Sequence, residues 1–220
     1  MIDWLITPRV FQVLVITGSV LSVFGSVITA LGYRGKRKQA YSPLNHFISE
    51  LGEVGVSQLA WVFNLGLILT GICLVPAAIG LGLMLSGWLA KAALAAGVVC
   101  ALGLAFVGVF PMNRLTPHTY AAMTFFRGGL VMVILFSLAI ALQDPAEALI
   151  SSWYAMAGLP AMAAFSTFLV LIGKSAQETE DPLGTEDVAR PRFWTLAVVE
   201  WSIFGSILLW LLLIAFGLSG

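Results

Sequence analysis

The sequence predicts an all-α protein, a polytopic bundle of six transmembrane helices. Its 220 residues are 60% hydrophobic and 10% charged, with a mean hydropathy of +0.98, whereas soluble domains are roughly half apolar and about a quarter charged. Six stretches reach the about 20 apolar residues that cross a hydrocarbon core of about 30 Å. None alternates with the period of two of a barrel strand, so helices must satisfy the backbone polar groups in lipid. We expect residues 1–220 to form a single integral membrane domain.

The six spans follow from the order of apolar runs and helix signals. We place them near residues 10–33, 56–85, 88–110, 117–142, 153–174 and 193–218. Small residues that permit close helix packing recur on the first and third spans, at Gly18, Ser22, Gly25, Ser26, Gly97, Ala101, Ala105 and Gly108. Pro76 and Pro160 should kink the second and fifth spans, because each removes one intrahelical hydrogen bond. Residues 175–191 form an acidic, solvated loop before the sixth span.

Lysine and arginine gather on one side of the predicted bundle. Connections one, three and five carry eight of them, at Arg34, Lys36, Arg37, Lys38, Arg114, Lys174, Arg190 and Arg192, against Arg9 and Lys91 opposite. The positive-inside rule therefore puts these three connections in the cytoplasm and predicts a multi-pass protein of the cell membrane. The formal net charge of zero and the absence of a basic stripe in the sequence argue against nucleic acid as a partner. Cys73 and Cys100, deep within apolar runs, are expected to be packing residues.

The segment after the first span, residues 41–53, is too polar for an ordinary span and too apolar for a free loop. We expect a short interfacial or re-entrant helix that begins with Ser42 as N-cap and Pro43 as first residue and ends at Gly52. Its polar residues then share one face, at i, i+3, i+4 and i+7. They are His46, Ser49, Glu50 and Glu53.

The third connection contributes further polar groups near the same surface. Thr116 is a good N-cap and Pro117 a good first residue for the fourth helix, which leaves His118 in its first turn. The positive end of the helix dipole favours neutral histidine there, which can accept a proton or bind a metal. Asn113 lies just before this helix.

Two charges fall deeper within the spans. Arg127 follows Pro117 by ten residues, or about 15 Å, and Glu200 lies about 10 Å into the sixth helix from the same surface. A lone charge at a helix centre costs about 2.5–3.5 kcal/mol, so each is the other's candidate partner. Two interpretations remain open: a structural ion pair, and an arginine that holds an anionic head group.

These residues together predict a polar pocket in one leaflet that binds a lipid or another amphiphile. Its entrance comprises His46, Ser49, Glu50, Asn113 and His118, and its floor comprises Arg127 and Glu200. The main alternative is a metal-dependent lipid hydrolase, in which His46, Glu50 and His118 bind zinc and activate water with Glu53 as a base. No metal is expected outside that alternative, and the sequence does not identify a cofactor. A serine hydrolase using Ser49 lacks a GxSxG elbow. A third interpretation is a structural subunit of a homo-oligomer or a larger membrane complex.

Several short motifs carry a family resemblance. They are the run from Asn45 to Gly52, Phe63-Asn-Leu-Gly66, Phe110-Pro-Met-Asn113 and Pro117-His118. With six spans, the chain resembles an uncharacterised bacterial family of unknown function. That family is itself similar to the damage-regulated autophagy modulator and GPI-lipid-remodelling membrane proteins, which share an Ile-Ser-Glu element after their first helix. The resemblance implies a six-helix fold and a link to lipid handling. It also implies that this element faces away from the cytosol, against the orientation that the charges indicate; we keep the charge-based orientation.

Overall fold

The computed structural model describes residues 6–36, 38–178 and 191–218. Within them lie six helices that are long and apolar enough to cross a membrane, and these confirm the predicted all-α six-helix architecture. They are α1 (Pro8–Gly32), α2 (Ala60–Met84), α3 (Gly87–Val109), α4 (Leu115–Ala141), α5 (Leu159–Glu178) and α6 (Thr195–Gly217). Most of the predicted acidic loop, residues 179–190, lies outside the described residues.

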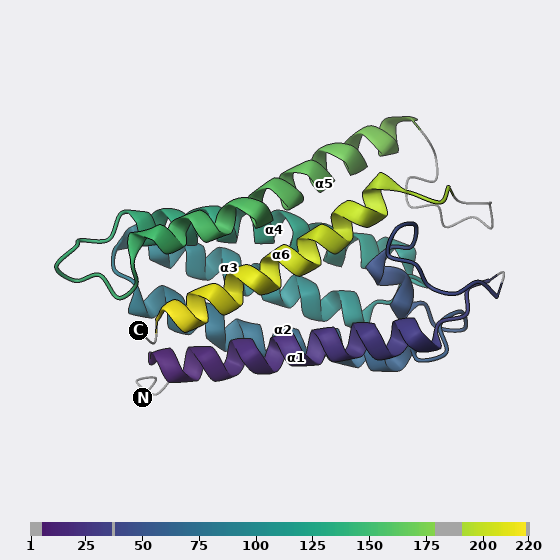
Figure 1. The fold of residues 1–220 in the computed structure, drawn as a ribbon, viewed down its shortest axis with the longest axis horizontal. Coiled ribbons are helices and arrows are strands. Elements are labelled where there is room, and N and C mark those ends of the chain that lie inside the picture. Colours follow the sequence, from purple (N-terminus) through teal and green to yellow (C-terminus); the bar gives the residue numbers. More distant parts are fainter. Residues whose placement is uncertain (1–5, 37, 179–190, 219–220) are drawn as a thin grey trace.

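The helices run side by side along the long axis of the molecule (Figure 1). The start of α1 and the end of α6 lie at one end of the bundle. Connections one and three lie at the other end, where α5 also ends and α6 begins. Helices α5 and α6 run alongside each other, and towards that end both tilt away from α1. One end of the bundle therefore carries connections one and three, and the other carries the termini, the short turn between α2 and α3, and the longer connection from α4 to α5.

The small residues of α1 and α3 let α2 approach closely from both sides. A Cβ added at Gly25 would lie 3.3 Å from the carbonyl oxygen of Val62, and one added at Gly108 would meet the carbonyl oxygen of Asn64. Gly71 of α2 lies against α3 in the same way, since its Cβ would be 2.7 Å from the Ala101 oxygen. These glycines are used for packing inside the bundle, as the sequence predicts.

Several predicted helix boundaries and kinks are wrong. Helix α2 begins at Ala60, four residues later than expected, because residues 54–57 form a turn in which Gly55 has a φ of +87°. The expected kink at Pro160 is absent, since α5 begins at Leu159 and the proline occupies its first turn, where no intrahelical donor is lost. A short 3-10 helix, η3 (Ser152–Gly158), precedes it.

Helix α4 also begins earlier than predicted. Its first residue is Leu115 and its N-cap is Arg114, not Thr116. Pro117 is therefore the third residue of the helix instead of the first. N–H groups in the first turn have no intrahelical acceptor, so the missing N–H of proline costs no hydrogen bond there. His118 remains in the first turn, as expected, and is buried.

The segment after α1 is not the continuous helix expected from Ser42. Residues 43–46 form a turn, and only Ile48–Gly52 are helical, as the 3-10 helix η2. This segment folds back into the bundle, and Phe47 and Leu51 are only 1% and 0% exposed. The Trp194 N–H, at the N-cap of α6, donates to the Leu44 carbonyl over 2.8 Å. Connection one thus closes one end of the bundle against α6.

Candidate functional site

A cavity of about 100 Å³ lies among α1, α2, α3, α4 and α6. No residue of α5 lines it. Apolar side chains cover most of its wall, including Phe11, Leu67, Phe136 and Leu211. The lining residues of α6 extend from Glu200 to Leu211, or about 16 Å along the helix, which is about half of the hydrocarbon thickness of a bilayer.

The hydroxyl groups along the wall are already used by the backbone. Ser22 donates to the Ser19 carbonyl over 3.0 Å, and Thr70 lies 2.7 Å from the Gly66 oxygen and 3.0 Å from the Gly18 oxygen. Such bonds to neighbouring carbonyls leave the hydroxyls little capacity to polarise the cavity. The middle of the cavity is therefore apolar in character.

Polar groups gather where the cavity meets η2. Its lining there includes Ser49 of η2, His118 of α4 and Glu200 of α6, which we call the polar end of the cavity. Glu200 is only 6% exposed. Its Oε2 accepts a 2.6 Å hydrogen bond from the Ile48 N–H. The first N–H groups of a short helix have no partner within it, so a carboxylate from another element stabilises this turn.

His118 presents one ring nitrogen to the backbone. Its Nδ1 lies 2.8 Å from the carbonyl oxygen of Phe110, the C-cap residue of α3. A carbonyl can only accept, so Nδ1 carries the proton, and Nε2 is the nitrogen with an available lone pair in the neutral ring. His118 is therefore oriented by the α3–α4 connection and offers an acceptor.

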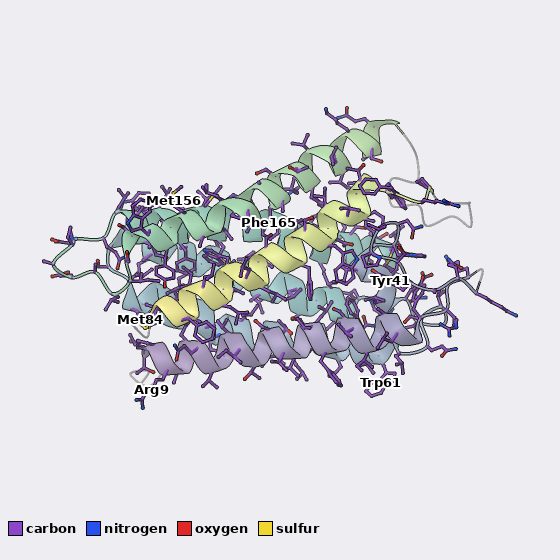
Figure 2. The ribbon with its side chains drawn as sticks, viewed as in Figure 1. Arg9, Tyr41, Trp61, Met84, Met156 and Phe165 are labelled. Atoms are coloured by element: carbon purple, nitrogen blue, oxygen red, sulfur yellow. The ribbon has the colours of Figure 1, made fainter. Side chains whose placement is uncertain are left out.

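An aromatic group holds connection one against α6. The Tyr41 hydroxyl donates to the Phe47 carbonyl over 2.8 Å and accepts from the Trp201 Nε1–H over 3.0 Å. The Tyr41 ring also stacks on His46, with centroids 5.2 Å apart. Figure 2 shows Tyr41 beside α6 at the end of the bundle opposite Arg9 and Met84. Burial, aided by the charge of Glu200, raises the pKa of Tyr41 far above its usual value, so the phenol stays a neutral donor.

His46 and Glu50, which the sequence assigns to the entrance of the pocket, are buried but do not line the cavity. The Glu50 carboxylate accepts from the Phe47 N–H over 2.7 Å, and His46 Nδ1 lies 3.1 Å from the Ser42 nitrogen. Both contacts lie within connection one itself. These two residues therefore shape the segment that carries Ser49 into the cavity.

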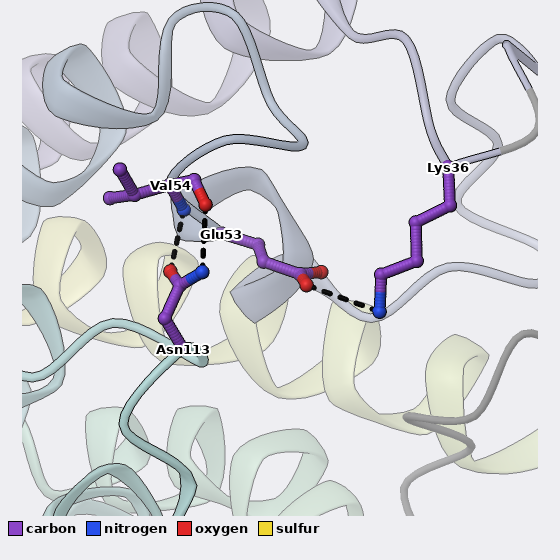
Figure 3. Close-up of polar contacts among 4 residues, drawn as sticks. All are labelled: Lys36, Glu53, Val54 and Asn113. Atoms are coloured by element: carbon purple, nitrogen blue, oxygen red, sulfur yellow. Dashed lines mark hydrogen bonds and ion pairs between the residues drawn. The ribbon is translucent and has the colours of Figure 1, made fainter.

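Asn113 also lies outside the cavity, where it makes contacts that hold the backbone. Its side-chain amide bonds both backbone polar groups of Val54, donating to the carbonyl and accepting from the N–H, each over 2.7 Å. On the other side of this turn, Lys36 pairs with Glu53 at 3.3 Å (Figure 3). Asn113 thus joins connection three to connection one, and neither contact reaches the cavity.

The expected pair of Arg127 and Glu200 does not form. Arg127 is exposed on the surface of α4, and none of the described residues makes an ion pair or hydrogen bond with its guanidinium. Its neighbours Phe126 and Gly128 face α5 and α3, so Arg127 points outward between them. It lies about 18 Å from the start of α4, near the middle of the membrane. The floor of the predicted pocket therefore lacks its arginine.

The proposed zinc ligands do not come together. In the described part of the chain, no group of three His, Cys, Asp or Glu side chains is placed to hold a metal ion. His118 lies at the cavity wall on α4, whereas His46 and Glu50 point into connection one. His46, Glu50 and His118 are therefore not grouped as three ligands of one metal ion in this structure.

Three contributors to this region are absent from the sequence-based site. Tyr41 and Trp201 are 160 residues apart in sequence, and only the fold shows that they bond. Asn64 of α2 donates to the Gly52 carbonyl over 3.0 Å. The signal for Asn64 was its position as an amide within an apolar span, where a polar side chain needs a partner. No comparable signal distinguishes Tyr41 or Trp201 from aromatic residues at membrane interfaces.

These features define a multi-pass membrane protein with an internal cavity that is polar at one end. The model of the family described as "Protein of unknown function (DUF998)" matches residues 16–217, and the chain belongs to this family. No curated protein and no solved structure matches the chain. The similarity to autophagy-modulator and GPI-lipid-remodelling proteins therefore stays a prediction.

Proposed function

We propose that this protein binds an amphiphile with a single hydrocarbon chain inside the bundle. The chain occupies the apolar cavity, and the head group lies at the polar end, against Ser49, His118 and Glu200. The observation that carries this proposal is the distribution of polarity: an apolar wall about 16 Å long with a buried carboxylate and a histidine at one end.

The size of the cavity supports an organic ligand. Its volume of about 100 Å³ is several times the about 10–15 Å³ that one water needs, and an apolar wall gives water few partners. An empty cavity of this size would cost about 2 kcal/mol at about 24 cal/mol per Å³. A hydrocarbon chain removes that cost, because it restores the dispersion contacts that the lining residues lack.

Binding is better supported than hydrolysis. A serine nucleophile needs its hydroxyl hydrogen-bonded to a base such as histidine. Among the described residues, no hydrogen bond joins the Ser49 hydroxyl to His118, and the His118 Nδ1–H bonds a backbone carbonyl instead of a carboxylate. The polar end thus has the groups that fix a head group, without the contact that would activate Ser49.

We also propose that the polar end faces the cytoplasm. Among the described residues, six Lys or Arg lie at that end of the bundle and two at the other. The six are Arg34, Lys36, Lys38, Arg114, Lys174 and Arg192, and the two are Arg9 and Lys91. This excess is what the positive-inside rule expects of cytoplasmic connections. The bound head group would then come from the inner leaflet or the cytoplasm.

The proposal is tested by filling the cavity from α6. Leu208 is half-buried and lines the cavity, while its neighbour Leu209 is 55% exposed on the lipid-facing side. We expect hexadecanol to raise the melting temperature of the detergent-solubilised protein and of Leu209→Trp, because a ligand that binds the native state stabilises it. Leu208→Trp occupies the site, so its melting temperature should not respond.

An equal response of all three proteins would show that the alcohol acts through the micelle or the outer surface, and would overturn the proposal. Absence of any response to chains of eight to sixteen carbons would overturn it as well. An organic extract of the purified wild-type protein, analysed by mass spectrometry, gives the second measurement. A single-chain amphiphile should be present there and depleted from the Leu208→Trp protein.

A further inference from the structure

The groups that line the polar end are hydrogen-bond acceptors, and this sets the chemistry of the head group. Glu200 presents a buried carboxylate and His118 presents the lone pair of Nε2. Among the residues that the structure describes, none that lines the cavity is lysine or arginine. Arg127, the cation that the sequence places nearby, is exposed on the outer surface of α4.

The Glu200 carboxylate has capacity for further donors. Two carboxylate oxygens offer about four lone-pair sites. The Ile48 N–H fills one of them, on Oε2. The other sites, on a side chain that lines the cavity, can accept from a ligand.

A second buried carboxylate strengthens the negative character of this region. Glu50 is 3% exposed and lies next to Ser49 in η2. Its carboxyl group accepts from the Phe47 N–H and that of Glu200 accepts from the neighbouring Ile48 N–H, so the two acidic groups lie at consecutive residues of one turn, where like charges repel each other. A positive head group between η2 and α6 reduces this repulsion, whereas a negative one adds to it in a region of low dielectric constant.

We propose that the cavity selects amphiphiles whose head group donates hydrogen bonds, a protonated primary amine above all, and discriminates against carboxylate and phosphate head groups. This inference rests on the proposed function. A primary ammonium has three donors, as in lysine, and is charged at neutral pH. One donor meets a lone pair of Glu200 and another meets Nε2 of His118. A carboxylate or phosphate head group has no donor for either acceptor and repels the carboxylate.

The test compares three head groups on one hydrocarbon chain. Hexadecylamine, hexadecanol and palmitate are titrated at pH 7 into the wild-type protein in detergent, and dissociation constants are taken from the shift in melting temperature. We expect hexadecylamine to bind at least tenfold more tightly than palmitate, with hexadecanol between them. Equal or tighter binding of palmitate would overturn the inference.

Variants assign the selectivity to Glu200. Glu200→Gln should reduce the affinity for hexadecylamine about tenfold and change the affinity for hexadecanol less than threefold. The matched control is Glu53→Gln, which neutralises a carboxyl of the same connection outside the cavity and should retain the wild-type order. Unchanged selectivity in a folded Glu200→Gln protein would contradict the assignment.

The same titrations separate the two proposals. If none of the three compounds stabilises the wild-type protein, the proposed function fails. If all three bind and Leu208→Trp abolishes binding, but the amine has no advantage, the cavity binds amphiphiles and the inference about the head group is wrong. The order in the wild-type protein decides this even if Glu200→Gln does not fold.

Discussion

Two charged residues lie within the membrane spans, one behind connection one and the other on the lipid-facing surface of α4. Their surroundings differ in opposite ways. Glu200 is buried and accepts a hydrogen bond from the Ile48 N–H. Arg127, near the centre of α4, is exposed and has no partner in the described part of the chain. The carboxylate is thus hydrogen-bonded within the protein, whereas the guanidinium must find its partners in lipid, water or another molecule.

The difference lies in what the neighbouring backbone can offer. Connection one folds back into the bundle and brings the Ile48 N–H of η2 to Glu200. Around Arg127, α3 and α5 present regular helices, whose carbonyls are already bonded within each helix. A buried charge in a membrane helix therefore requires irregular backbone close by, which is tolerated where it is enclosed by protein.

The largest effect is expected at Glu200. Glu200→Leu removes the acceptor of the Ile48 N–H, and an unsatisfied buried donor costs about 1–3 kcal/mol. We expect the free energy of unfolding to fall by about 3 kcal/mol in SDS titrations of the protein in mixed micelles. Glu200→Gln keeps an acceptor oxygen and should lose about 1 kcal/mol. A Glu200→Leu protein as stable as the wild type would show that this hydrogen bond does not hold η2.

An effect of similar size and opposite sign is expected at Arg127. On insertion scales, arginine at a helix centre is about 3 kcal/mol less favourable than leucine. Arg127→Leu should therefore increase membrane insertion of α4 and raise resistance to SDS, because no contact of the described residues is lost. Arg127→Lys, which keeps the charge, is the control and should resemble the wild type. Destabilisation by Arg127→Leu would mean that the guanidinium has a partner in the native protein.

A smaller effect, about 2 kcal/mol, is expected from a methyl group at Gly52. A Cβ there would clash with Oδ1 of Asn64, whose amide also donates to the Gly52 carbonyl. Overpacking of this kind costs about 1–3 kcal/mol. Gly173→Ala on α5 is the matched control, since a Cβ at Gly173 meets no atom within 4 Å. Thermal unfolding in detergent should show a loss of stability in Gly52→Ala and none in Gly173→Ala.

Much of the fold could be predicted from the sequence because it depends on local properties. The six spans follow from apolar length, and the close approach of α1, α2 and α3 follows from their small residues. The errors in the predicted helix boundaries also have local causes, but the sequence shows these causes less clearly. At Pro160, for example, composition does not distinguish a helix start from a kink, because proline is tolerated in a first turn and disruptive further on.

The candidate site was harder to predict because its members come from distant parts of the chain. The sequence identifies Glu200 and His118 as polar groups that need partners, and both line the cavity. It assigns Arg127 to the same pocket, but the side chain leaves α4 on the opposite side from the cavity wall. Depth along a helix follows from counting residues, whereas the side on which a residue faces depends on which helices pack beside it.

The sequence by itself determined that this protein crosses the membrane six times and that its scarce polar residues lie towards one end, because both follow from the free energy of placing each residue type in lipid. Only the tertiary structure decided which polar residues meet. Connection one folds inward, so the backbone N–H of Ile48 reaches Glu200, and Arg127 remains outside. A hydrogen bond depends on distances of about 3 Å between atoms, and such distances are set by the packing of whole helices.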